Sequence, residues 1–433
     1  MGKIKKYWKF IFKNRYLIIV FIIFLFEVFL RFYQMDLKNP FGYDQVDNAW
    51  AAKNIIINHA YPLVGMVAKA NSGIYIGPLY YYFVSIFYWI FNLNPIASWY
   101  IAGFTSLLSF LVIFYLTKKL FSVETAIFAI ILNTFNFSAI FYFDRVQWPV
   151  QLLPLISLII FYLLYKVITG DIKKIFFLAI AVGIAFNIHF TAIFFPIIIL
   201  LSLPLFPRNK QTLKYLLLSL VLFIIFIIPN IAYLLINKAA SANAIYISTF
   251  YHGFHLTRMF QITKDAIIQF DPYLVLDKIK QLKILILPFF FFVYLFKSFT
   301  AEKKRFSYLV LLYFIVPWII FTTYSGEISD YYFGINRYIA LLILSFLIYR
   351  VWKIKFVFVK ILVLALICLY GFVNLSNFLP YKDEGNLINK EQIVKKALNE
   401  KREIGYAQGV PESYVYYYYY LKLKGVDPYA NKK

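Results

Sequence analysis

Residues 215–235 read YLLLSLVLFIIFIIPNIAYLL and contain no charged side chain. A helix needs about 20 mostly apolar residues to cross the hydrocarbon core of a bilayer. Of all 433 residues, 62% are hydrophobic and only 15% are charged, whereas soluble domains are about a quarter charged. A bilayer tolerates this composition because a helix satisfies its own backbone polar groups. The sequence therefore predicts an all-α integral membrane protein that crosses the bilayer many times.

Further stretches of the same kind predict a polytopic helical bundle of about 11 spans. With residues 215–235, they are 16–32, 96–116, 126–143, 150–165, 175–188, 191–206, 284–296, 308–323, 338–352 and 356–373. The basic segment before residue 16 has no small-residue cleavage site, which favours a retained signal anchor. The apolar residues 75–91 would reverse the charge pattern if they spanned. We therefore expect them to form a short interfacial or re-entrant helix.

The placement of Lys and Arg predicts the orientation in the membrane. With a cytoplasmic N-terminus, the inner loops hold basic clusters at residues 118–119, 166–174, 208–214, 297–305 and 350–355, as the positive-inside rule requires. We expect a multi-pass plasma membrane protein whose residues 1–373 form the transmembrane domain. Residues 34–95 are then a long first outer loop with juxtamembrane helices, 237–283 a later outer loop, and 374–433 a small extracytoplasmic tail. In the tail we expect a strand near 402–410 and a helix after Pro411.

The net charge of +24 does not indicate nucleic acid, because the basic residues form short clusters between apolar runs. The sequence contains no P-loop, no Gly-rich dinucleotide motif, no Cys cluster and no Ser-His-Asp arrangement. Its four His residues form no metal-ligand pattern. An enzyme with this sequence would need a substrate that arrives already activated, and we expect no nucleotide.

The first outer loop carries two carboxylates in the segment NPFGYDQVDNAW, residues 39–50. Asp44 stands where a helix begins and Asp47 follows three residues later, so both lie on one face of the helix. One interpretation is capping, with Asp44 accepting backbone N–H bonds and Asp47 favoured by the helix dipole. The other is a pair of catalytic carboxylates at the membrane surface.

Two more charged segments lie on the same predicted side of the membrane. In FYFDRVQWPVQ, residues 141–151, Asp144 and Arg145 form either a local ion pair or part of a site. The later segment YSGEISDYYFGINRYIALL, residues 324–342, holds a second candidate group: Glu327, Asp330, Tyr331 and Arg337. Arg337 opposes the positive-inside trend, so either it snorkels to lipid headgroups or it binds a phosphate, for which Arg is suited.

These motifs resemble the polytopic glycosyltransferases of the GT-C fold, in the branch of the protein O-mannosyltransferases and lipid A aminoarabinose transferases. The resemblance covers roughly the first 200 residues. It rests on FGYDQVDNAWAAKNII, residues 41–56, on GIYIGPLYYYFVSIFYWIF, residues 73–91, and on FDRVQWPVQLLP, residues 143–154. It implies a sugar donor linked to polyprenyl phosphate and an acceptor hydroxyl on a lipid, glycan or protein.

The resemblance also implies roles for particular residues. Asp44 corresponds to the catalytic carboxylate of the first loop, and Asp144 and Arg145 belong to the same pocket. The departing lipid phosphate needs a cation, which Arg337, Arg145 or Lys264 would supply. Many members carry an Asp-Glu pair where this chain has Asp44 and Gln45, so Asp47 is the alternative second carboxylate. This departure leaves a divalent metal ion as an open possibility.

Two other functions fit a polytopic protein with charges at one membrane face. A transporter or flippase of a lipid-linked glycan would place ionisable residues near the bilayer midplane or in interrupted helices. A polymerase or ligase of lipid-linked glycans would lack the paired acidic loops after the first and third spans. The positions of the candidate charges, at the outer ends of spans, favour the glycosyltransferase.

Overall fold

The computed structural model describes residues 2–68, 74–238, 259–262, 301–324, 328–407 and 410–428. Helices dominate these ranges, and no β-strand occurs within them. The predicted all-α membrane fold is therefore confirmed. Helices occur at ten of the eleven predicted spans, and the remaining one, 284–296, lies outside the described residues.

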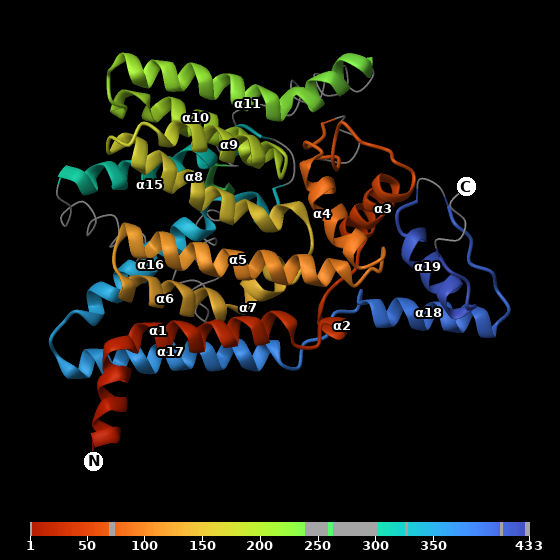
Figure 1. Ribbon diagram of the computed structural model, residues 1–433, viewed down its shortest axis with the longest axis horizontal. Helices are drawn as coiled ribbons and strands as arrows, with labels where there is room; N and C mark the ends of the chain where they lie inside the picture. The colour runs from red at the N-terminus through yellow and green to blue at the C-terminus, as the bar shows by residue number, and fades with distance from the viewer. Residues whose placement is uncertain are drawn as a thin grey trace.

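The long helices run side by side as a bundle (Figure 1). They are α1 (Gly2–Phe32), α5 (Ala97–Leu120), α8 (Leu153–Ile168), α11 (Lys210–Ile236), α15 (Ala301–Thr323), α16 (Gly334–Trp352) and α17 (Val357–Phe378). Shorter apolar helices lie among them: α6 (Val123–Thr134), α9 (Lys174–Phe186) and α10 (Phe194–Ser202). Six described helical segments are long and apolar enough to cross a membrane. Little of α11 or α17 is buried, as expected for helices that face lipid.

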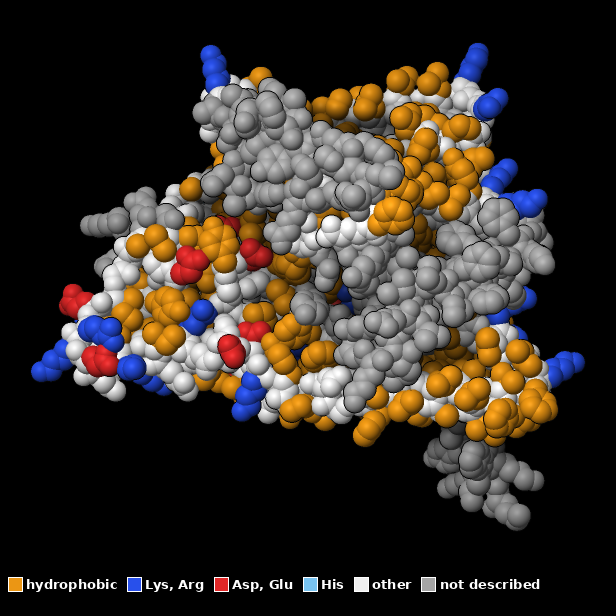
Figure 2. All heavy atoms as spheres, turned by 180° about the vertical axis from the view of Figure 1, so that it is seen from behind, with side chains coloured by type: hydrophobic (Ala, Val, Ile, Leu, Met, Phe, Trp, Pro, Cys, Tyr) orange, Lys and Arg blue, Asp and Glu red, His pale blue; other side chains and the backbone are white. Residues whose placement is uncertain are grey.

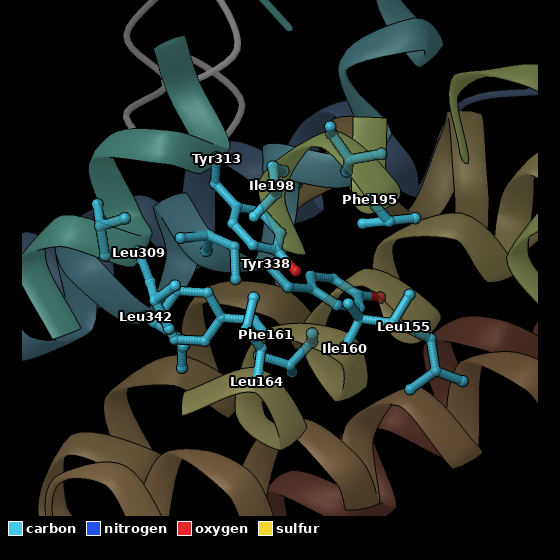
Figure 3. Packing of buried hydrophobic residues seen from close by; sticks show 14 of the residues in the cluster. Leu155, Ile160, Phe161, Leu164, Phe195, Ile198, Leu309, Tyr313, Tyr338 and Leu342 are labelled. Atoms are coloured by element: carbon cyan, nitrogen blue, oxygen red, sulfur yellow. The ribbon is translucent and has the colours of Figure 1, made fainter. Parts of the chain in front are cut away.

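The main core lies where α8, α10, α15 and α16 meet (Figure 3). Phe161 of α8 packs edge-on against Tyr313 of α15, with ring centroids 5.2 Å apart. Ser157 of α8 donates a hydrogen bond to the backbone carbonyl of Ile335 in α16 at 2.5 Å. Lipid is as apolar as the side chains of these helices, so the hydrophobic effect does not drive them together. Close packing and hydrogen bonds between helices do so instead.

The third predicted span, residues 126–143, is wrong as a continuous helix. α6 ends at Thr134, and a short α7 (Phe137–Ala139) then leads into a π-helical turn, η1 (Ile140–Asp144). Asn136 begins the new helix after the break, because its Oδ1 accepts the backbone N–H of Ala139 and so caps α7. The carbonyls left free at the end of α6 accept hydrogen bonds from Arg31, which meets the need to satisfy backbone groups within a membrane.

Beyond one end of the bundle, four helices gather into what we call the head (Figure 1). They are α3 (Tyr43–Ile57), α4 (Leu79–Ile90), α18 (Leu387–Asn399) and α19 (Ser413–Leu423). They share a hydrophobic cluster in which tyrosines of α19 pack with α3 and α4. α4 has only 12 residues, fewer than a span needs, which agrees with a helix that does not cross the bilayer; its interfacial position stays a prediction. The helix after Pro411 is α19, whereas the described residues 402–407 do not form the expected strand.

The two ends of the bundle differ in charge. In the face shown in Figure 2, Asp and Glu side chains lie at the head among Lys and Arg side chains, whereas the charged side chains at the opposite end are Lys and Arg. This difference agrees with the loop-by-loop pattern from which the orientation was predicted. The cytoplasmic position of the N-terminus itself stays a prediction.

Candidate active site

Asp44 lies in the first turn of α3, within the head. The residue before this helix is Gly42, and its backbone N–H donates to Oε1 of Gln45 at 2.8 Å. Gln45, not Asp44, therefore satisfies the start of the helix, so the capping interpretation of Asp44 is wrong. No hydrogen bond stabilises the carboxylate of Asp44 among the described residues. The half-buried carboxylate is left available for chemistry.

Burial and a neighbouring charge make Asp44 a stronger base than an ordinary carboxylate. Burial, followed by the charge of Asp47, raises the pKa of Asp44 to about 6. Burial also raises the pKa of Asp47, although a hydrogen bond opposes the shift and the charge of Glu412 adds to it. That bond comes from the Tyr81 hydroxyl at 2.6 Å. A carboxylate with a pKa near neutrality is suited to general base catalysis.

The tyrosines of α4 are positioned by a close contact between the first loop and the end of α9. The backbone N–H of Leu79 donates to Oδ1 of Asn187 at 3.3 Å. Just before it, Gly77 approaches Asn187 so closely that a Cβ at position 77 would lie 1.8 Å from that same oxygen. Only glycine fits there. The contact fixes the start of α4, from which Tyr80 and Tyr81 reach the carboxylates of α3.

Asp144 forms a buried ion pair with Arg31, near the end of α1. Arg31 also pairs with Glu27 one turn earlier, at 3.1 Å, and donates to Ser106 of α5. All three charged side chains are almost fully buried. Asp144 thus fastens the segment after α7 to α1, rather than presenting an unpaired carboxylate.

Arg145 is bonded in the same region. Its guanidinium donates to the carbonyls of Leu30 and Tyr33, at 2.7 and 2.9 Å, and to Oδ1 of Asn39 at 2.7 Å. These contacts satisfy the last turn of α1, whose carbonyls have no helical partner. The ion pair predicted between Asp144 and Arg145 is therefore not formed; each residue bonds to the end of α1 instead.

Arg337 is buried near the start of α16 and lies against aromatic rings. Its guanidinium carbon is 4.1 Å from the ring centroid of Phe143. The Phe143 ring neighbours that of Trp148 at 6.3 Å, and the Trp148 ring lies 5.0 Å from that of Tyr331. A buried cation over an aromatic face is stabilised by the ring, which offsets part of its cost.

The segment 143–148 joins the two candidate groups. Gln147 accepts a hydrogen bond at its carbonyl from Nε2 of Gln45, at 2.8 Å, next to Asp44. Its neighbour Trp148 contacts Tyr331 in the aromatic group around Arg337. One short segment therefore contacts both α3, next to Asp44, and the aromatic group around Arg337.

His189 is a residue to which the sequence pattern assigned no role. It is buried beside Tyr331 and Tyr332, with ring centroids 5.7 and 5.4 Å away. Its Nδ1 lies 2.8 Å from Oγ1 of Thr191, and burial lowers the pKa of His189 to about 3. A neutral histidine in this position offers a hydrogen bond rather than a charge. In the sequence, the only signal for this position of His189 is that it directly follows an apolar run.

Three other predicted residues cannot be assessed from their side chains. Lys264 and Glu327 lie outside the described residues. Asp330 begins the short 3-10 turn η7 (Asp330–Phe333) that precedes α16. Within the described ranges, no group of three His, Cys, Asp or Glu side chains could hold a metal ion. Asp44 and Asp47 together provide only two carboxylates.

Comparison with known proteins adds a family and several solved structures. Residues 76–233, less than half of the chain, match the family model described as dolichyl-phosphate-mannose-protein mannosyltransferase. The matched region contains α4 and the segment 143–148 but begins after Asp44. No curated protein sequence matches this chain.

Among solved structures, ArnT from Cupriavidus metallidurans bound to undecaprenyl phosphate is similar, with a TM-score of 0.56 at 11% identity. The similarity covers 94% of this chain and 69% of ArnT. The oligosaccharyltransferase AglB from Archaeoglobus fulgidus, in complex with an inhibitory peptide and a dolichol-phosphate, has a TM-score of 0.51 at 14% identity. There the similarity covers 95% of this chain but only 60% of AglB.

Proposed function

We propose that this chain, which has the GT-C fold, is a membrane glycosyltransferase that moves a sugar from a polyprenyl-phosphate donor to an acceptor hydroxyl. The reaction would take place at the outer face, where the head lies in the predicted orientation. The proposal rests mainly on the carboxylate of Asp44. Its pKa is raised to about 6, and it has no hydrogen bond among the described residues. The solved structures of ArnT with undecaprenyl phosphate and of AglB with a dolichol-phosphate support a lipid-linked donor.

The proposed reaction balances without a cofactor. The acceptor oxygen forms a bond to the anomeric carbon of the sugar as the bond from that carbon to the phosphate oxygen breaks. The acceptor proton passes to Asp44, acting as general base. The polyprenyl phosphate departs with its negative charge facing Arg337, which stabilises it electrostatically.

The remaining residues have supporting roles in this proposal. Asp47, held by Tyr81, keeps the pKa of Asp44 high through its charge. Asp144 and Arg145 bond to the end of α1 and so position the segment 143–148, which we call the second loop. We therefore do not assign them a proton transfer. Tyr331 and Trp148 line the side on which Arg337 lies. We leave the sugar and the acceptor molecule unassigned.

Reconstitution with two kinds of donor tests the proposal. Purified protein in liposomes should transfer sugar from a polyprenyl-phosphate donor and not from a nucleotide sugar. Asp44→Asn should remove the activity, whereas Glu391→Gln, an acid-to-amide change in α18 of the same head, should not. Transfer from a nucleotide sugar with no lipid carrier present would refute the donor assignment. Movement of the intact lipid-linked sugar across the bilayer would favour the flippase alternative instead.

A further inference from the structure

Gln45 uses both atoms of its side-chain amide in hydrogen bonds, although it is almost fully buried. Its Oε1 accepts from the backbone N of Gly42, and its Nε2 donates to the backbone carbonyl of Gln147, each at 2.8 Å. The first bond is local and closes the start of α3. The second crosses 102 positions of sequence and ties α3 to the second loop.

A second bond extends this tie to α4. The side-chain amide of Gln147 bonds to the hydroxyl of Tyr80 at 3.0 Å. Burial, opposed by that bond and aided by the charge of Asp44, raises the pKa of Tyr80. Three segments thus converge beside Asp44: the start of α3, the start of α4 and the second loop.

The chemistry of this tie requires an amide at position 45. A carboxylate there would still accept from Gly42, since Glu serves that role well at the third helical position. It has no hydrogen to donate to Gln147 when ionised. It would instead place negative oxygens against a carbonyl oxygen, one residue from Asp44. An Asp-Glu pair at positions 44 and 45 is therefore incompatible with this particular contact.

We propose that Gln45 is a positioning residue, whose amide ties the first acidic segment to the second loop and so holds Asp44 in register with the Arg337 group. This inference rests on the proposed function, because the register matters only if Asp44 and Arg337 act on one substrate. Under this proposal, the amide at position 45, where the resemblance implies a second acid, serves as the hydrogen-bond donor to Gln147.

The test exchanges the amide for the acid. Gln45→Glu keeps an acceptor for Gly42, loses the bond to Gln147 and adds a negative charge next to Asp44. A matched control is Asn58→Asp, an amide-to-acid change at the exposed far end of α3. We expect Gln45→Glu to lower kcat at least roughly tenfold, since small misplacements of catalytic groups are costly, with the donor KM little changed. Residues 145–151 should exchange backbone hydrogen for deuterium faster in this variant only.

Three results would overturn the inference. The first is a wild-type kcat in Gln45→Glu, and the second is an equal loss in Asn58→Asp, which would indicate a general charge effect. The third is full rescue of Gln45→Glu by a divalent metal, which would mean that a second carboxylate at position 45 serves as well. If Gln45→Glu does not fold, Tyr80→Phe breaks the adjoining bond and should lower kcat in the same way, and unchanged turnover would then count against the tie. If the wild-type protein transfers no sugar, the proposed function fails, while the exchange measurement still tests the tie itself.

Discussion

The raised pKa of Asp44 predicts an unusual pH dependence of sugar transfer. With a pKa of about 6, the carboxylate is ionised in about 0.9 of molecules at pH 7 and in about 0.1 at pH 5, as a base that must be deprotonated requires. With the ordinary value of 3.8, about 0.9 would still be ionised at pH 5. Turnover should therefore fall about tenfold between pH 7 and pH 5.

Removing the neighbouring charge should shift the pH at which turnover falls on the acidic side of the profile, which we call the acidic limb. Asp47 is the second cause of the shift after burial, so Asp47→Asn lowers the pKa of Asp44 and preserves more activity at pH 5. The sign follows because a negative neighbour disfavours ionisation. Asp44→Asn should instead lose about 10²–10⁴-fold in turnover at pH 7, the usual contribution of a general base.

The assay is initial-rate transfer from a polyprenyl-phosphate sugar by the reconstituted protein, measured from pH 5 to pH 8. Donor binding should be measured at both ends of the range, so that changes in KM are separated from changes in kcat. If turnover by the Asp47→Asn protein falls at the same pH as turnover by the wild type, the electrostatic argument is contradicted. A fully active Asp44→Asn protein would remove Asp44 from the chemistry altogether.

Three further substitutions test the surrounding structure. Arg31→Ala leaves Asp144 as an uncompensated buried charge and should cost about 3–5 kcal/mol, seen as a lower unfolding temperature in detergent; Arg31→Ala with Asp144→Ala should recover part of it. Gly77→Ala forces a Cβ against Asn187 and should cost about 1–3 kcal/mol, detected by thermal unfolding and by proteolysis of the first loop. Arg337→Ala should raise the donor KM and lower kcat, and Arg337→Lys should restore only part, because a point charge does not replace a bidentate group.

The sequence alone determined the membrane environment, the all-α class and the positions of most helices in the bundle. Hydropathy and helical periodicity are local properties, so residues 215–235 already predict the helix found at Lys210–Ile236. The same local logic placed Asp44 and Asp47 on one face of α3, and the proline at position 411 preceded α19 as expected. The break after Thr134 escaped this reasoning, because an asparagine that caps a new helix within an apolar run looks like any other polar residue.

Only the tertiary structure decided which charged side chains are paired with buried partners. Arg31 and Asp144 are 113 positions apart, so no local pattern predicts that they pair, or that Arg145 turns to the carbonyls of α1 instead. The bond from Gln45 to Gln147 likewise depends on how α3 packs against the second loop. The packing of the helices decides which partner a charged side chain has, because a buried charge or amide must form hydrogen bonds with whatever groups surround it. Asp44, whose carboxylate has no hydrogen bond among the described residues, is therefore the first candidate for chemistry.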